Sequence, residues 1–202
     1  MKAFDVCTGV AAVIDRNDID TDVIVRIERI AQLKRGQFAP WAFEIWRYRP
    51  DGGENPDFVL NQPPFRSAQI LVAGNNFGCG SSREMAVWAL DEFGIRCVVA
   101  PSFGDIFYNN CLQIGVLPVR LAAEQIGPIA TAARQGVPVT VDLRACTVYL
   151  PDGYCASFTL PESQRTALLE GLDDVDMAVA REDRIRAFQE MDRRRRPWAY
   201  PR

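Results

Sequence analysis

Strand-like and helix-like segments alternate from residue 69 onward, and this order constrains the fold more than any other feature of the chain. The expected strands are 70–73, 97–100 and 116–120, and the expected helices are 82–93, 103–112 and 122–134. Strand–helix–strand units place successive strands parallel and cover the sheet with helices. The order therefore predicts an α/β fold with a mainly parallel central sheet. Six apolar residues in a row, 85–90, indicate that the helix at 82–93 is buried nearly all round.

Segments on either side of this alternation have weaker patterns. They predict strands at 9–15, 137–143, 147–150 and 156–160, and helices at 162–172 and 181–194. Residues 31–66 are rich in proline, glycine and aromatic residues without a clear period, which predicts a long loop region. A chain of 202 residues suffices for one domain with a sizeable core, so we expect a single domain over residues 1–202.

A glycine-rich loop joins the strand at 70–73 to the helix that follows it. The loop contains glycines at 74, 78 and 80 and ends in Ser81-Ser82-Arg83-Glu84. Glycine lets the backbone come close to a ligand, and a helix N-terminus attracts anions through its free N–H groups. Two hydroxyls and a guanidinium fork at that point suit a carboxylate. The loop therefore predicts an active site for a small anionic substrate.

Two other interpretations of this loop use the same residues. Ser81 and Glu84 have the spacing of a capping box, which would satisfy backbone donors and nothing else, but capping requires no arginine. Nucleotide loops fit less well. The string Gly-Lys-Ser/Thr of a Walker A loop is missing, and a dinucleotide fingerprint that starts at Gly78 would require a glycine or alanine where Arg83 stands.

Composition excludes several classes of function. The net charge of −3 provides no electrostatic footprint for nucleic acid, so no nucleic-acid partner is expected. No apolar run approaches the roughly 18 residues of a membrane span, and the first residues lack the apolar core of a signal peptide, so we expect a cytoplasmic protein without a membrane partner. The chain has no histidine, which excludes serine and cysteine triads and histidine zinc sites. A general base must then be a carboxylate, Lys, Tyr, Cys or an activated Ser.

Metal binding by this chain is not expected. The six cysteines are scattered without a C-x-x-C pair. We therefore expect them to be small buried hydrophobic residues rather than disulfide partners or cluster ligands. Cys79 lies in the glycine loop, but no histidine is present to activate it as a nucleophile. The run Asp18-x-Asp20-x-Asp22 has calcium-loop spacing, yet valine and arginine occupy the positions that require glycine and glutamate, which excludes calcium.

Five strings spread along nearly the whole chain form a recognisable set: Asp18-Ile-Asp-Thr-Asp, Phe77-Gly-Cys-Gly-Ser-Ser-Arg-Glu, Ala100-Pro-Ser-Phe-Gly-Asp, Gly115-Val-Leu-Pro-Val and Arg196-Pro-Trp. In this order they closely resemble the small subunits of 3-isopropylmalate dehydratases, which belong with the aconitases. The resemblance implies the swivelling β/β/α domain of aconitase. It also implies a separate large subunit that carries a 4Fe–4S cluster, so this chain is expected to bind no cofactor itself.

The resemblance also implies a reaction and roles for five residues. The enzyme dehydrates a 2-substituted malate and rehydrates the alkene on the neighbouring carbon, which interconverts 2-isopropylmalate and 3-isopropylmalate in leucine biosynthesis. Ser81 would be the general base, an alkoxide held by backbone amides, and Ser82 and Arg83 would bind a substrate carboxylate. Thr21 and Asp22 would position the substrate or the arginine. Iron on the partner would hold the departing hydroxyl as a Lewis acid.

Departures from the family pattern leave other functions open. Met85 stands where the family usually has histidine, residues 23–26 differ from the usual Gln-Ile-Ile-Pro, and residues 30–40 are expected to be longer than the usual turn. The region 31–66 is expected to shape substrate choice, and Arg26, Lys34 and Arg35 supply cations for a further carboxylate. The alternatives are a paralogous dehydratase subunit for another 2-substituted malate, of the methylmalate or dimethylmalate type, and a catalytically idle assembly subunit.

Overall fold

A computed structural model describes residues 1–200 and shows two compact units, which we describe one at a time. The first comprises residues 1–171, and the second begins at Leu172. Both β-sheets and the two large apolar cores lie within the first unit. The extension of a single domain over residues 1–202 stays a prediction.

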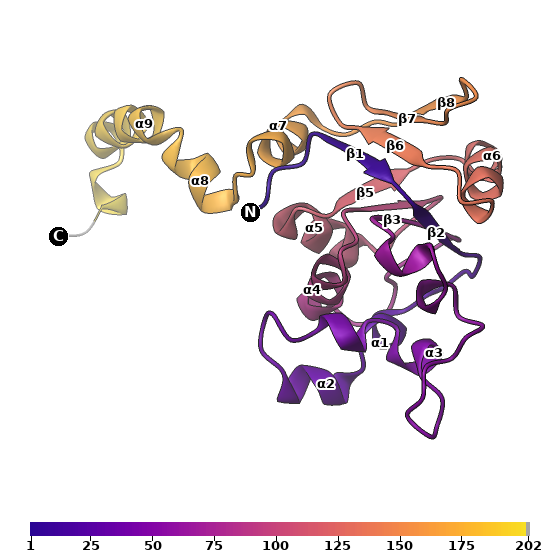
Figure 1. The fold of residues 1–202 in the computed structure, drawn as a ribbon. Coiled ribbons are helices and arrows are strands. Elements are labelled where there is room, and N and C mark those ends of the chain that lie inside the picture. Colours follow the sequence, from indigo (N-terminus) through magenta and orange to yellow (C-terminus); the bar gives the residue numbers. More distant parts are fainter. Residues whose placement is uncertain (201–202) are drawn as a thin grey trace. The chain divides into compact units, whose positions relative to one another are not determined.

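The parallel sheet is the centre of the first unit (Figure 1). Its strands, in spatial order, are β2 (Ala11–Ile14), β3 (Ile70–Ala73), β4 (Cys97–Ala100) and β5 (Leu117–Arg120). All three neighbouring pairs are parallel. The β3 and β4 side chains are buried on both faces, as short apolar runs in a helix-covered sheet should be. The predicted mainly parallel sheet is confirmed for these four strands.

A second, antiparallel sheet has the order β1-β6-β7-β8. Its strands are β1 (Val6–Gly9), β6 (Val139–Asp142), β7 (Thr147–Tyr149) and β8 (Cys155–Ser157). The strand predicted at 9–15 contains β2, but Gly9 belongs to β1, which was not predicted. The chain leaves one sheet and enters the other at Val10, whose carbonyl accepts from Gln69 N at 3.2 Å. β1 pairs with β6, about 130 residues away in sequence, and apolar patterning cannot show such a break.

Helices cover the two faces of the parallel sheet, as the alternation of strand side chains requires. Leu71 and Val98 point into a core with α4 (Glu84–Phe93) and α5 (Asp105–Ile114), which pack against each other. Ile70 and Val99 point into the other core, which contains α6 (Ala123–Arg134), α7 (Glu162–Glu170) and the antiparallel sheet. This layering of two sheets and helices agrees with the predicted β/β/α class.

The predicted long loop at 31–66 contains short helices. They are α2 (Ile27–Gln32), α3 (Glu44–Arg47) and 3-10 turns at Ala39–Trp41, Val59–Asn61 and Phe65–Ser67, and α1 (Thr21–Ile24) precedes them. The region is ordered by its own side chains. The Phe43 and Trp46 rings stack at 5.9 Å, and the buried guanidinium of Arg47 donates to Asn61 Oδ1 at 3.2 Å. Each helix is too short to show a helical period in the sequence.

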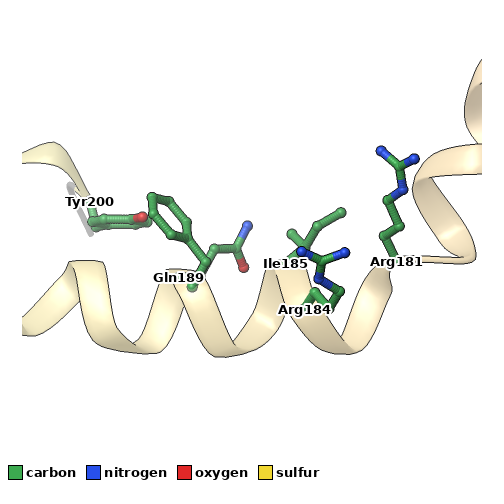
Figure 2. Close-up of a pocket in the computed structure, with 6 residues that line it drawn as sticks. Arg181, Arg184, Ile185, Gln189 and Tyr200 are labelled. Carbon is green, nitrogen blue, oxygen red and sulfur yellow. The ribbon is translucent and has the colours of Figure 1, made fainter. Parts of the chain in front are cut away.

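The second unit is helical in its described part. It contains α8 (Asp174–Val179), α9 (Glu182–Arg195) and a 3-10 turn at Pro197–Ala199. Figure 2 shows Ile185 and Gln189 of α9 with Tyr200 lining a cavity of about 530 Å3 in this unit. None of the expected site residues lines this cavity. No helix of residues 1–200 is long and apolar enough to cross a membrane.

Candidate active site

Three loops leave the carboxyl ends of neighbouring parallel strands and meet at one edge of the sheet. Residues 15–20 follow β2, residues 74–83 follow β3, and residues 101–104 follow β4. Ligands of open α/β sheets bind at this edge, because the loops there can be varied without disturbing the strands. The glycine loop therefore lies where a parallel sheet places its binding site.

The first two loops are joined by a set of hydrogen bonds. Asn75 N donates to Asn17 Oδ1 at 2.8 Å, Asp18 N donates to Asn75 O at 2.9 Å, and Asn76 Nδ2 donates to Asp18 Oδ1 at 2.7 Å. Asp18 and Asn76 have positive φ angles of 54° and 57°, a conformation that Asp and Asn tolerate better than most residues. Asn17 and Asp18 of the acidic run thus hold the glycine loop in place through hydrogen bonds.

The glycine loop also lies tightly against the start of α5. Phe77 is fully buried, with its ring centroid 5.4 Å from that of Phe107, and Gly104 N donates to Phe77 O at 2.9 Å. Gly78 has a φ of 72°, and a Cβ on it would lie 2.1 Å from Phe107 Cγ. A Cβ on Gly104 would lie 2.6 Å from Gly78 O. Both positions therefore require glycine, and the loop has one defined path.

All five residues assigned from the sequence come together in this loop and α1. Thr21, the first residue of α1, is buried, and its Oγ1 donates to Ser81 O at 2.9 Å. Thr21 N donates to Cys79 O at 3.0 Å. Asp22 forms an ion pair with Arg83 through a close Oδ1–Nη1 contact. Ser82 lies between Ser81 and Arg83 in the chain. The two sequence motifs, about 60 residues apart, therefore form one site.

Arg83 is the buried charge of the site. Its side chain is only 12% exposed, whereas that of its partner Asp22 is 54% exposed. Nη1 is buried and makes no well-formed hydrogen bond within residues 1–200, so the Asp22 contact is electrostatic. A buried guanidinium with unused donors is costly unless another acceptor satisfies it. An anionic ligand supplies such an acceptor.

Ser81 and Ser82 are exposed, and no hydrogen bond of either hydroxyl is found in the described part of the chain. The predicted helix start at 82 is wrong, because α4 begins at Glu84 with Arg83 as its N-cap residue and without a side-chain cap. The capping box of Ser81 and Glu84 does not form. Glu84 Oε1 accepts instead from Trp88 Nε1 at 3.2 Å. Both serine hydroxyls are therefore available beside the N-terminus of a ten-residue helix.

The surroundings of Cys79 disfavour its thiolate form. Burial raises the pKa of its thiol, and the carboxylates of Asp20 and Asp18 raise that pKa further. Cys97 and Cys111 are fully buried, and burial raises their thiol pKa values well above 9.0. Residues 1–200 contain no group of three His, Cys, Asp or Glu side chains placed to hold a metal ion.

Ser102 is a site-supporting residue that the sequence did not single out. Its Oγ accepts from Asn76 N at 2.8 Å, and its carbonyl accepts from Phe77 N at 3.0 Å. The signal available in the sequence was the string Ala100-Pro-Ser-Phe-Gly, where the chain turns directly after a buried strand. Two cavities lie in the first unit, and only the smaller one includes residues of the three loops. One of about 370 Å3 includes Arg16 and Trp46, and one of about 740 Å3 includes Arg26 and Trp41.

Comparison with known proteins shows to which family this chain belongs. Residues 1–124 match the aconitase C-terminal domain. A 3-isopropylmalate dehydratase small subunit from Paramagnetospirillum magneticum is 48% identical over 98% of this chain and 100% of its own length. The chain belongs to the 3-isopropylmalate dehydratase small-subunit family. A member from Brucella anthropi is 46% identical over 98% of this chain and all of its own length.

A solved structure agrees with this family. The 3-isopropylmalate dehydratase from Methanocaldococcus jannaschii superposes with a TM-score of 0.66 at 25% identity, covering 91% of this chain and 99% of that one. Met85 is the position at which the resemblance leads us to expect a histidine. Met85 is half-buried and packs against the core of α4 and α5, so position 85 has a packing role here.

Proposed function

We propose that this chain is the small subunit of a hydro-lyase that interconverts 2-isopropylmalate and 3-isopropylmalate in leucine biosynthesis, active only with a large subunit. The observation that carries the proposal is the largely buried Arg83 guanidinium, which pairs with Asp22 without a well-aligned hydrogen bond at Nη1 and lies beside the exposed Ser81 and Ser82 in the chain. The sequence similarity to 3-isopropylmalate dehydratase small subunits extends over nearly the whole chain and supports the same reaction.

Ser81 would act as the general base, with Arg83 and Ser82 binding a substrate carboxylate. Removing a proton from the carbon next to a carboxylate builds negative charge, and a preorganised cation at that carboxylate stabilises it. Gly80 precedes Ser81 with a φ of 87°, and the N-terminus of α4 follows, so the backbone dipole favours an anionic serine. Asp22 would hold the Arg83 side chain in place, and Thr21 would hold the backbone of Ser81.

The cluster belongs, in this proposal, to the large subunit. The cysteines of this chain do not fit a 4Fe–4S site, because two are fully buried in the core and no three of those in the described residues are placed to hold a metal ion. All six cysteines are free thiols, which fits a cytoplasmic complex. The substrate is a small dicarboxylate, and neither nucleic acid nor a membrane is a partner.

A panel assay with the cognate large subunit tests the substrate. Alkene absorbance would be followed with 2-isopropylmalate, 2-methylmalate, 2,3-dimethylmalate and homocitrate, at equal concentrations of the complex. We expect the highest kcat/KM for 2-isopropylmalate. A clearly higher value for another member would assign the chain to a paralogous dehydratase, and no turnover of any member would favour an assembly subunit.

A further inference from the structure

The cavity of about 370 Å3 in the first unit is lined by charged and apolar side chains that the proposed reaction does not use. Three segments of the chain form its walls: residues 13–16 at the end of β2, and residues 45–46 and 55–59 in the region with short helices. None of the five residues assigned to the active site lines it. Its size lies at the lower end of the roughly 300–1,000 Å3 that small-molecule sites enclose.

Two rings, Trp46 and Phe58, form an aromatic wall on one part of the cavity. Their centroids lie 5.9 Å apart, and both rings pack against Phe43, which is fully buried, at 5.9 and 6.0 Å. Ile45 also lines the cavity and is 46% exposed. A ligand that covers an exposed apolar side chain gains free energy by removing it from water. The cavity therefore suits an apolar group.

Two opposite charges border the same cavity without pairing with each other. The guanidinium carbon of Arg16 lies 4.6 Å from the Trp46 ring centroid, and Arg16 forms no ion pair within residues 1–200. Asp57 has no cationic partner in the described part of the chain either. The third charge, Asp15, is already paired with Arg134 at 2.7 Å. An unpaired cation and an unpaired carboxylate in one cavity suit a molecule that carries both charges.

Backbone contacts hold both charged residues in place. Asp57 N donates to Asn55 Oδ1 at 3.1 Å, and Asn55 Nδ2 donates to Trp46 O at 3.0 Å, which joins the carboxylate to the aromatic wall. Arg16 O accepts from Gly74 N at 3.1 Å, at the first glycine of the glycine loop. A Cβ on Gly74 would lie 2.5 Å from Arg16 O, so this contact is close. A ligand that holds Arg16 is therefore coupled to the start of that loop.

We propose that this cavity is a second binding site, which takes a free α-amino acid with a branched apolar side chain. The carboxylate of the amino acid pairs with Arg16 and its ammonium with Asp57, while its side chain covers Ile45 and the aromatic wall. Because Arg16 also holds Gly74, an occupied cavity makes the start of the glycine loop less mobile. The site is separate from the proposed active site and does not depend on the proposed reaction.

Calorimetric titration of the full chain with L-leucine tests the site. We expect a dissociation constant below about 1 mM, because two charge-assisted contacts act together with apolar burial. Three probes each lack one group: 4-methylpentanoate lacks the ammonium, 3-methylbutylamine lacks the carboxylate, and glycine lacks the apolar side chain. Each should bind at least about tenfold more weakly. A weaker dissociation constant for L-leucine, or equal affinity for any of the three probes, would overturn the proposal.

Two variants locate the ligand in the cavity. Arg16→Gln and Asp57→Asn each remove one charge, so each should weaken L-leucine binding at least about tenfold. Both residues are exposed, so both variants should fold. Arg49→Gln is the matched control, because Arg49 is exposed and lines the neighbouring cavity of about 740 Å3, and it should bind L-leucine as the wild type does. Unchanged affinity in Arg16→Gln, or an equal loss in Arg49→Gln, would contradict the assignment.

Arg83→Lys separates this cavity from the proposed active site, whose arginine is the other cation that a leucine carboxylate can meet. We expect L-leucine to bind this variant as it binds the wild type. A loss in Arg83→Lys together with unchanged binding to Arg16→Gln would place the amino acid in the active site and overturn the second site. The titration requires no turnover, so a failure of the proposed reaction would leave its result standing.

Amide hydrogen exchange at Gly74 measures the coupling to the glycine loop. Saturating L-leucine should slow this exchange at least about twofold in the wild type and leave it unchanged in Arg16→Gln. Equal exchange with and without L-leucine in the wild type would show that the bound amino acid does not act on the loop.

Discussion

The buried hydroxyl of Thr21 donates to the carbonyl of Ser81 at 2.9 Å, which fixes the backbone of the proposed base from a helix 60 residues away in sequence. Thr21→Val keeps the shape and removes the donor. We expect a loss of about 1 kcal/mol in the free energy of unfolding and a lower kcat, because Ser81 loses its orientation. Urea unfolding and steady-state kinetics of the complex measure the two effects.

Thr131→Val is the control for that substitution. Thr131 Oγ1 also donates to a carbonyl, that of Gly127 at 3.0 Å, but on the exposed face of α6. We expect kcat to stay at the wild-type value. If Thr21→Val left kcat unchanged as well, the Thr21–Ser81 bond would have no part in catalysis.

The geometry of the Arg83 guanidinium should matter as much as its charge. Arg83→Lys keeps the charge but loses the planar fork, so kcat/KM should fall about 10- to 100-fold with a raised KM. Arg144→Lys makes the same change at an exposed pair with Asp5 and should leave kcat/KM unchanged. Equal activity of both variants would show that Arg83 does not bind the substrate as a fork.

Gly78 should tolerate no side chain. Gly78→Ala would place a Cβ within 2.1 Å of Phe107 Cγ at a φ of 72°, and we expect a loss of at least about 2 kcal/mol in the free energy of unfolding. Gly127→Ala, inside α6 with nothing within 4 Å of the added Cβ apart from its chain neighbours and its own helix, should change the free energy of unfolding by less than about 1 kcal/mol, because Pro128 opposes the gain in helix propensity. Chemical denaturation measures both, and equal effects would contradict the tight path of the loop.

Stability should fall at alkaline pH because of two buried thiols. Burial raises the pKa of Cys97 and Cys111 well above 9.0, so above pH 9 the unfolded chain loses protons that the folded chain keeps. The free energy of unfolding then decreases with rising pH, by up to about 1.4 kcal/mol per pH unit for each thiol. Urea unfolding at pH 8, 9 and 10 should show a smaller slope for the Cys97→Ala/Cys111→Ala variant. A slope equal to that of wild type would exclude these thiols as the cause.

The parallel sheet could be predicted because its strands are apolar runs with clear ends. Ile70–Ala73 and Cys97–Ala100 lie where the sequence placed them. The break at Val10 could not be predicted, because β1 is defined by its pairing with a strand 130 residues later. The two helices beside the antiparallel sheet, α6 and α7, were also close to their expected bounds.

The clustering of the expected site residues was predictable in part. The glycine loop indicated anion binding at Ser81, Ser82 and Arg83, and the family resemblance added Thr21 and Asp22. Spacing alone could not show that Asp22 and Arg83 form an ion pair, since tertiary contacts join them.

Alkene formation from 2-isopropylmalate, followed by absorbance in the complex with the cluster-loaded large subunit, tests Ser81 most directly. We expect no turnover by this chain alone, turnover on mixing, and a loss of at least about 100-fold in kcat for Ser81→Ala with little change in KM, because only the base is removed. Circular dichroism of the variant checks its fold. Near-wild-type turnover by Ser81→Ala, or robust turnover by this chain without a partner, would contradict the proposed site.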